Sequence, residues 1–160
     1  MLNKKSPEIC SLLRSIIPDK QYKISLSKSG VPTLSIICSD GTRRRFHSKY
    51  DPIQEAARFI KTCLASETSN YIIIGLGLGY HLHELIKIVS NNARIIVIEK
   101  NPSLARLAFT YNDFSSVIST EKVEKFSKPD FLSFFSTISK VVSASEEKET
   151  LLKSTSTEIS

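Results

Sequence analysis

Hydrophobic and polar residues alternate in the first third of the chain, which is the pattern of half-buried strands. Strict alternation over residues 22–28 predicts a first strand. Turn signals that contain glycine separate it from a second predicted strand at residues 34–38 and a third at residues 44–47. Together with a short helix expected within residues 1–18, the opening third is predicted to be a small antiparallel meander.

A helical repeat of apolar residues replaces the alternation from residue 51 onward. Asp51 and Pro52 form a typical helix start, and the apolar stripe that follows predicts a helix ending near Leu64. Later segments are read in the same way. They predict a helix from Asn101-Pro102, a weak strand at residues 116–119, and a last helix from Pro129-Asp130.

The centre of the chain carries its most informative pattern. The apolar residues 71–74 run into three glycines at alternate positions, Gly75, Gly77 and Gly79. An amphipathic segment follows, and then a second apolar run, residues 95–98, which is closed by Glu99. The order strand, glycine turn, helix, strand and acid is that of a nucleotide-binding βαβ unit. The fold class is therefore α/β: a small N-terminal antiparallel β meander followed by a Rossmann-like βαβ unit with a short parallel sheet.

Three regions are expected along the chain. Residues 1–50 hold the N-terminal helix and the basic meander, and residues 51–142 hold the Rossmann-like unit. Residues 143–160 are rich in Ser, Thr, Glu and Lys, a composition that predicts a disordered or weakly helical tail. Doubly wound sheets usually have about five or six parallel strands. Two parallel strands are predicted firmly here and a third weakly, so we expect an accessory domain or a piece of a longer protein.

Positive charge is concentrated in the part of the sequence that precedes the glycine loop. The net charge is +6, and residues 1–50 hold ten Lys or Arg against three acids. Arg43, Arg44 and Arg45 lie at the centre of this excess, with His47 and Lys49 close by. Such a patch predicts contact with an anion or a partner, although charges also protect a strand edge from pairing. Alternating aromatic and basic residues are absent, so nucleic acid is not an expected partner.

Other site classes are not supported by the sequence. No apolar run approaches the roughly 20 residues of a membrane helix, and the N-terminus has no signal-peptide core, which predicts a cytoplasmic protein. The three cysteines are far apart in the sequence, which does not favour a metal site. His81 and His83 fall on different sides of a helix, so no metal site is predicted. No spacing of nucleophile and histidine predicts a catalytic residue.

The glycine loop is the candidate binding site. Glycines lack a Cβ, and the N–H groups of the following helix point toward the loop, so a phosphate, ribose or sulfonium group would approach the main chain closely. The predicted contacts are the three glycines, the ring of Tyr80, His81 as a neutral donor, and Glu99 for ribose hydroxyls. Two plainer interpretations remain open: the glycines only permit a tight turn, and His81 is a surface polar residue.

The spacing of the loop departs from two known patterns. The dinucleotide pattern GxGxxG needs glycine at position 80, where this chain has Tyr80. The observed GxGxG is closer to S-adenosylmethionine-dependent methyltransferases. Those enzymes usually carry an acid two residues before the first glycine, where Ile73 stands here.

Two segments together carry a family resemblance. HSKYDP occupies residues 47–52, and GLGLGYHL occupies residues 75–82. Within residues 40–112 the sequence is similar to the N-terminal domain of the bacterial motility-associated factor (Maf) glycosyltransferases. That resemblance implies transfer of a nonulosonic acid from its CMP-activated form to flagellin. It also implies that the chemistry belongs to a central catalytic domain, so flagellin and that domain are the expected partners.

Three functions follow for comparison with the structure. The first is a noncatalytic, Rossmann-like accessory module of a flagellin glycosyltransferase. The second is a small nucleotide- or S-adenosylmethionine-binding protein of methyltransferase type. The third is a noncatalytic interaction domain. Any ligand of the loop would be a nucleotide, with a CMP-sugar, NAD or S-adenosylmethionine as the candidates.

Overall fold

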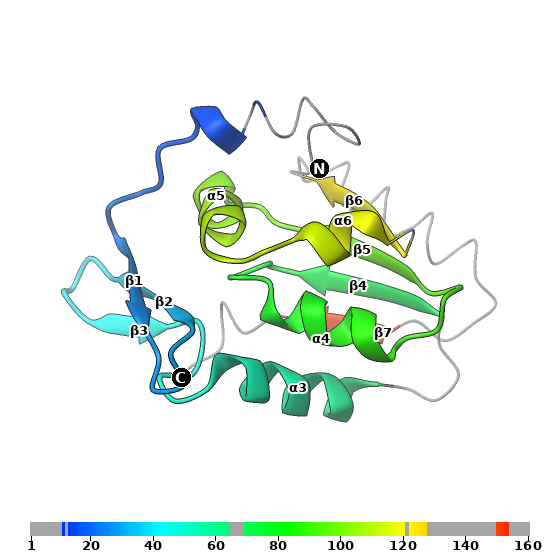
Figure 1. Cartoon of the computed structure of the whole chain (residues 1–160). Helices are drawn as coiled ribbons and strands as arrows, with labels where there is room; N and C mark the ends of the chain where they lie inside the picture. The colour runs from blue at the N-terminus through cyan, green and yellow to red at the C-terminus, as the bar shows by residue number, and fades with distance from the viewer. Residues whose placement is uncertain (1–10, 12, 65–68, 121, 128–149, 154–160) are drawn as a thin grey trace.

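The computed structural model describes residues 11, 13–64, 69–120, 122–127 and 150–153. A small antiparallel sheet lies at one end of the molecule, and a parallel sheet covered by helices forms the rest (Figure 1). This arrangement confirms the predicted α/β class. Among the described helices, none is long and apolar enough to cross a membrane.

The first sheet is the predicted meander. Its strands are β1 (Tyr22–Leu26), β2 (Pro32–Ile37) and β3 (Arg43–Arg45), in that order and antiparallel. The third strand was expected at residues 44–47. The chain leaves β3 earlier because Phe46 and His47 turn into the interior, where both are buried. Of the predicted N-terminal segment, residue 11 and residues 13–15 are described and helical, whereas residues 16–18 are described and not helical.

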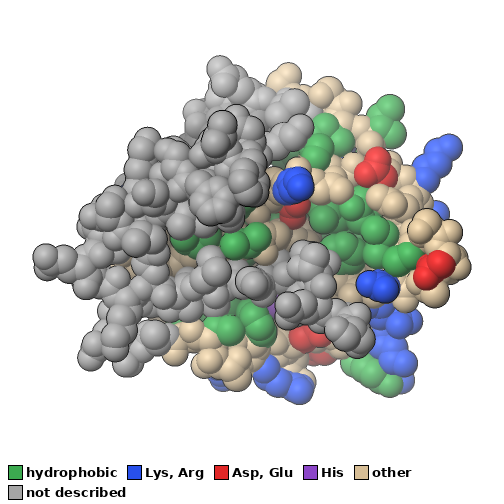
Figure 2. Space-filling model, turned by 180° about the vertical axis from the view of Figure 1, so that it is seen from behind, with side chains coloured by type: hydrophobic (Ala, Val, Ile, Leu, Met, Phe, Trp, Pro, Cys, Tyr) green, Lys and Arg blue, Asp and Glu red, His purple; other side chains and the backbone are tan. Residues whose placement is uncertain are grey.

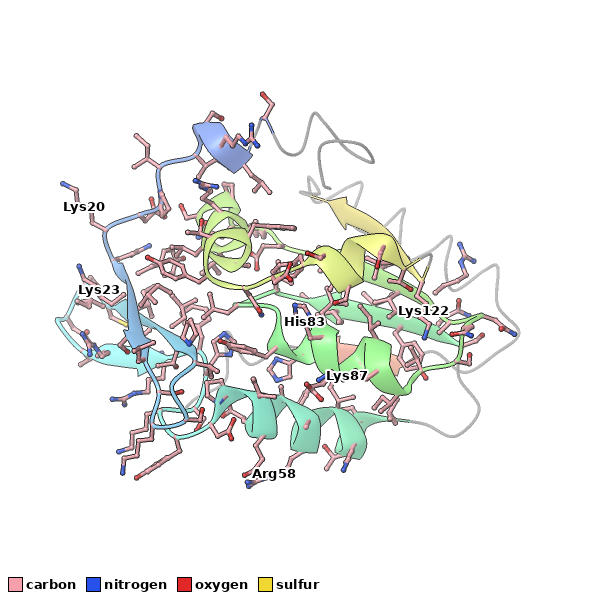
Figure 3. The ribbon with its side chains drawn as sticks, viewed as in Figure 1. Lys20, Lys23, Arg58, His83, Lys87 and Lys122 are labelled. Carbon is pink, nitrogen blue, oxygen red and sulfur yellow. The ribbon has the colours of Figure 1, made fainter. Side chains whose placement is uncertain are left out.

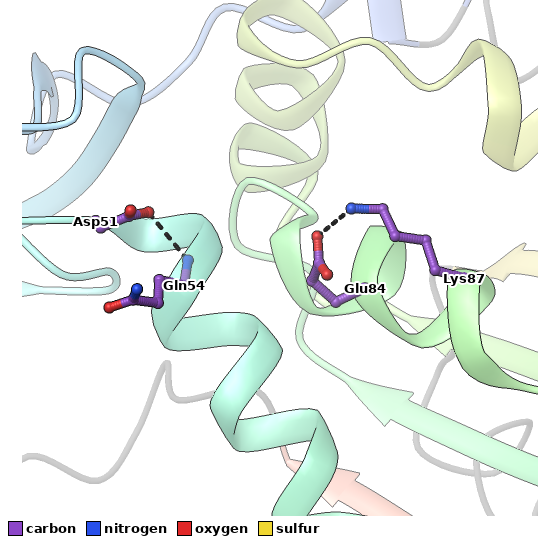
Figure 4. A network of polar contacts seen from close by, with 4 residues as sticks. All are labelled: Asp51, Gln54, Glu84 and Lys87. Atoms are coloured by element: carbon purple, nitrogen blue, oxygen red, sulfur yellow. Dashed lines mark hydrogen bonds and ion pairs between the residues drawn. The ribbon is translucent and has the colours of Figure 1, made fainter.

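Helix α3 (Pro52–Cys63) begins where the sequence predicts. The Asp51 carboxylate accepts a hydrogen bond of 3.0 Å from the Gln54 N–H, which satisfies one of the free donors at the helix start (Figure 4). Ala56 and Ile60 form its buried stripe. On the neighbouring helix, Lys87 pairs with Glu84 one turn earlier (Figure 4).

The parallel sheet has the strand order β6-β5-β4-β7. Its elements in chain order are β4 (Asn70–Ile74), α4 (Tyr80–Ile88), β5 (Arg94–Ile98), α5 (Pro102–Tyr111), α6 (Ser115–Ser119), β6 (Val123–Ser127) and β7 (Thr150–Lys153). β4 and β5 pair in parallel with Ile72 opposite Ile96. Lys122 closes the end of α4, since its ammonium donates to the carbonyl oxygens of Ile86 and Val89 (Figure 3).

Two elements differ from the sequence predictions. Residues 116–119 were expected as a strand but belong to helix α6. The Asp113 carboxylate accepts from the Ser115 N–H at 2.8 Å, which starts a helical turn and lets Val117 enter the core.

The second difference is strand β7, which lies within the segment predicted to be a disordered or weakly helical tail. Its two leucines lie opposite Ile72 and Ile73, where β7 adds a parallel strand beside β4. The predicted helix from Pro129-Asp130 and the predicted boundary at residue 142 lie outside the described residues.

Two apolar clusters hold the fold together. One packs α3, α4, α5 and α6 against a single face of the parallel sheet. The other joins the meander to the helical part, because Leu34 and Phe46 pack with Leu78, Tyr80 and Leu104. The meander is therefore attached at the end of the parallel sheet that carries the glycine loop.

Candidate functional site

The glycine loop joins β4 to α4, as predicted. Gly77 has a φ of +55° and Gly79 a φ of +86°, backbone conformations that L side chains rarely adopt. Gly79 is also the N-cap of α4 and makes no side-chain capping hydrogen bond. The turn thus needs glycine for its conformation alone, before any ligand is considered.

Glu99 lies beside this loop, where the sequence places it. Its Oε2 accepts a hydrogen bond of 2.8 Å from the Leu76 N–H, and its Oε1 accepts one of 2.7 Å from the Asn101 N–H. Burial raises the pKa of Glu99, and the hydrogen bonds from the main chain oppose that rise. Both oxygens therefore already hold main-chain donors, and the carboxylate ties the loop to the start of α5.

His47 occupies the space that the central glycine leaves. A Cβ at Gly77 would lie 2.7 Å from the Cε1 atom of His47, which is inside van der Waals contact. The Leu78 N–H donates to His47 Nε2 at 3.0 Å, and the imidazole is only 4% exposed. A side chain from the end of the meander thus fills the place where the sequence predicts a nucleotide.

The third glycine is covered in the same way. A Cβ at Gly79 would lie 2.4 Å from the Phe114 ring. The Leu78 carbonyl accepts from the Asn112 amide at 2.9 Å, so the loop is also held from the α5 side. Both sides of the turn are therefore in contact with protein.

Tyr80 fastens the start of α4 to the meander. Its hydroxyl donates to the Pro32 carbonyl oxygen at 2.6 Å, and burial raises the pKa of Tyr80 to about 12. A second link comes from the Asn101 amide, which donates to the Tyr22 hydroxyl at 2.6 Å. The phenol predicted as a ligand contact is thus engaged with β2.

His81 is a core residue. Its side chain is 3% exposed, and its ring lies 5.1 Å from Phe59 and 6.4 Å from His47, measured between ring centroids. The interpretation of His81 as a surface residue is therefore wrong, because its helical face points into the cluster between α3 and the loop. Neither of its ring nitrogens has a hydrogen-bond partner in the described part of the chain.

His83 has a different neighbour, as the two-residue spacing predicts. Its ring lies 5.0 Å from that of Phe114, on the side of α4 that faces α6 (Figure 3). No group of three or more His, Cys, Asp or Glu residues that would hold a metal occurs among the described residues.

The basic residues are separate from the loop. Arg43, Arg44 and Arg45 are exposed on β3, and Lys49 is exposed in the segment that follows. The ammonium groups of Lys28 and Lys49 lie 4.6 and 5.0 Å from the centre of the Tyr50 ring. Of the five residues predicted to contact an anion or partner, His47 alone points inward. Seen from behind, Lys and Arg side chains gather mainly along the edges of the molecule (Figure 2).

A groove that the sequence analysis missed lies at the start of α3. It encloses about 430 Å³ and is lined by Ser48, Tyr50, Asp51, Gln54, Glu55 and Arg58. Two lining residues are joined by the Ser48 N–H, which donates to the exposed Glu55 carboxylate at 2.7 Å, while Arg58 extends from the outer side of α3 (Figure 3). The sequence signal was the HSKYDP segment, residues 47–52, which contributes Ser48, Tyr50 and Asp51 to the lining.

Comparison with known proteins places these features in a family. The family model of the glycosyltransferase Maf N-terminal domain matches residues 20–127. A Maf glycosyltransferase from Magnetospirillum magneticum AMB-1 has a similar structure, with a TM-score of 0.63 at 14% identity. The match covers 98% of this chain and 31% of that one, so the chain spans about a third of the length of that glycosyltransferase.

Other similarities are weaker. A spermidine synthase from Thermotoga maritima matches with a TM-score of 0.42 at 13% identity, over 71% of this chain and 50% of that one. This similarity is too low to support an argument about function. No curated protein sequence matches the chain.

The contact between His47 and Gly77 gives a first prediction. Gly77→Ala should lower the free energy of unfolding by about 2 to 5 kcal/mol, because strain at positive φ adds to overpacking against a buried ring. Gly41→Ala is the matched control, since Gly41 has a φ of +81° and no atom within 4 Å of its added Cβ. Urea unfolding of both variants measures the difference. Equal losses would show that His47 does not constrain the loop.

Acidification gives a second prediction. Burial lowers the pKa of His47 to about 3 and that of His81 to about 4, whereas both side chains titrate near 6.5 in the unfolded chain. The unfolded chain therefore binds more protons as the pH falls below 6.5, and the folded state loses stability toward pH 4. Between pH 7 and pH 5 we expect a loss of about 2 kcal/mol for each histidine.

A variant separates the two contributions. His81→Phe keeps a flat ring and removes one buried titrating group, so it should reduce the loss between pH 7 and pH 5 by about 2 kcal/mol. His83, whose pKa burial also lowers, acts in the same direction in both proteins. Urea unfolding at the two pH values measures the change. An unaltered pH dependence in the variant would contradict the assignment to His81.

Proposed function

Because this chain belongs to the family of glycosyltransferase Maf N-terminal domains, we propose that it is a noncatalytic accessory module of a glycosyltransferase that modifies flagellin with nonulosonic acids. The module would act as a rigid support for the catalytic domain and would present a basic surface to flagellin. In this proposal, the catalytic domain of the glycosyltransferase, and not this module, transfers the sugar. The proposed cellular location is the cytoplasm.

The main support for this proposal is that side chains of the protein itself occupy the glycine loop. A nucleotide in a Rossmann-like fold lies at the carboxyl ends of the strands, against a glycine turn and a helix start. Here the N–H groups of Leu76 and Leu78 donate to Glu99 and His47, and the turn lies against the His47 ring. A phosphate would have to displace two hydrogen bonds, one buried and one partly buried, so the loop favours support of the fold over ligand binding.

The exposed residues of the meander support the second part of the proposal, which is that the module presents a basic surface to flagellin. Arg43, Arg44 and Arg45 are all exposed on β3, with Arg43 and Arg45 on one face of the strand and Arg44 on the other. The groove at the start of α3 lies close to Lys49 along the chain and offers carbonyl, carboxylate and guanidinium groups beside the half-exposed Tyr50 ring. Exposed charge next to an aromatic ring is typical of a surface that meets a protein partner.

Ligand binding tests the filled loop. Purified chain should show no increase in melting temperature with millimolar CMP, a CMP-activated nonulosonic acid, NAD or S-adenosylmethionine. A functional site would add about 2.7 kcal/mol of stability at a ligand concentration 100 times its Kd. A saturable shift with any of the four that Glu99→Gln weakens would overturn the accessory role in favour of a nucleotide-binding protein.

Flagellin binding tests the basic surface. Arg44→Glu reverses one exposed charge on β3 and should lower the affinity for flagellin by about three- to tenfold, more strongly at low salt. Lys61→Glu reverses an exposed charge on α3 and serves as the control. Calorimetry at two salt concentrations measures both. Equal effects of the two variants would contradict a flagellin contact through β3.

A further inference from the structure

Exposed apolar side chains are concentrated at one end of the meander. Six large apolar side chains are exposed among the described residues, and three of them are Leu26, Tyr50 and Ile53, at 72%, 53% and 40% exposure. Leu26 ends β1, and Ile53 lies in the first turn of α3. The turn after β1 lies beside the chain that enters α3 (Figure 1). Single exposed apolar residues are normal, whereas a group of them marks an interaction site.

Two main-chain hydrogen bonds hold this end of the meander together. The Lys28 N–H donates to the Lys49 carbonyl oxygen at 2.9 Å, and the Ser29 N–H donates to the Tyr50 carbonyl oxygen at 2.8 Å. These bonds join the turn after β1 to the segment that precedes α3, so residues distant in sequence form one surface. We call this surface the meander tip, and its members are Leu26, Lys28, Lys49, Tyr50 and Ile53.

Positive charge surrounds the apolar groups of the meander tip. Lys28 and Lys49 are exposed, and their ammonium groups lie 4.6 and 5.0 Å from the centre of the Tyr50 ring. Neither lysine is paired with a carboxylate in the described part of the chain. The nearby carboxylates of Asp51 and Glu55 already accept hydrogen bonds from main-chain N–H groups. The tip therefore presents two unpaired cations on either side of an aromatic side chain in sequence, next to exposed aliphatic groups.

This combination suits the surface of a lipid bilayer. A tyrosine ring is stable at the level of the lipid headgroups, where one end is apolar and the other is wet. Each Lys or Arg near an anionic bilayer strengthens binding by about fivefold. A protein partner would need a shaped pocket to bury a side chain as exposed as Leu26, whereas a bilayer accepts apolar groups without such a pocket.

We propose that the meander tip binds the surface of a membrane that contains anionic lipids. Leu26 and Ile53 would enter the boundary between headgroups and acyl chains, with the Tyr50 ring at headgroup depth. Lys28 and Lys49 would contact lipid phosphates. Cytoplasmic leaflets carry anionic lipids, which agrees with the location proposed above. The tip is distinct from the β3 arginines proposed to contact flagellin, so either proposal can fail without the other.

Sedimentation with vesicles tests the binding. The full chain should sediment with vesicles of phosphatidylcholine and phosphatidylglycerol at low salt, less so at high salt, and not with phosphatidylcholine alone. Lys49→Glu should lower the partition coefficient by at least about fivefold. Lys61→Glu reverses an exposed charge in the last turn of α3 and should change it little. No sedimentation with the anionic vesicles, or equal effects of the two variants, would overturn the proposal.

A fluorescent reporter tests which surface meets the lipid. The chain contains no tryptophan, so Tyr50→Trp places a single reporter at the tip. On anionic vesicles its emission should shift to the blue and be quenched by brominated acyl chains. Tyr111→Trp, at an exposed position on α5, should show neither change. An unquenched reporter at position 50, or equal quenching at both positions, would overturn the proposal.

Flagellin binding distinguishes the lipid from a protein occupant of the tip. Calorimetry with Lys49→Glu should give an affinity for flagellin close to that of the unsubstituted chain, since the proposed flagellin contact is at β3. A loss of flagellin affinity in Lys49→Glu, together with no binding of the unsubstituted chain to anionic vesicles, would overturn the proposal and assign the tip to the protein interface.

Discussion

The contact between the His47 imidazole and the main chain at Gly77 and Leu78 is the constraint on which the structure depends. It joins the meander to the parallel sheet through one hydrogen bond and one close approach of the ring edge, at Cε1 and Nε2, to Gly77. Both partners need the other. The Leu78 N–H is buried and requires an acceptor, while His47 fits only because position 77 carries no Cβ. Glycine in this loop is thus explained by a side chain of the same protein.

This contact determines the protonation state of the His47 imidazole. His47 Nε2 accepts a hydrogen bond, so it holds no proton, and burial together with neighbouring His81 lowers the pKa of His47. A neutral ring offers no positive charge to a phosphate. Nearby, Glu99 carries a buried carboxylate whose two oxygens are shared between Leu76 and Asn101. The Leu76, Leu78 and Asn101 N–H groups thus all have side-chain acceptors, whereas His47 Nδ1 and both ring nitrogens of His81 have no hydrogen-bond partner among the described residues.

Local patterns predicted most of the fold, and long-range contacts account for what they missed. The meander, the start of α3 at Asp51 and the position of Glu99 each follow from residues close together in sequence. The role of His47 does not, because 31 residues separate it from Leu78. Helix α6 was also not predicted. Its start depends on the Asp113 side chain, and its forming a helix instead of a strand depends on the burial of Val117.

A Rossmann-like unit whose crevice is occupied by its own side chains is suited to a supporting role, in which it holds a surface rigidly in place. Ligand-binding crevices at strand ends are normally left open and are formed by loops that move. Here the Tyr80 and Tyr22 hydroxyls and the His47 ring hold the strand ends to the meander. A meander fixed in this way presents Arg43, Arg44 and Arg45 in a constant position relative to the sheet. In the proposed accessory role, binding a partner at this surface would cost little ordering entropy, because the surface is already held in place.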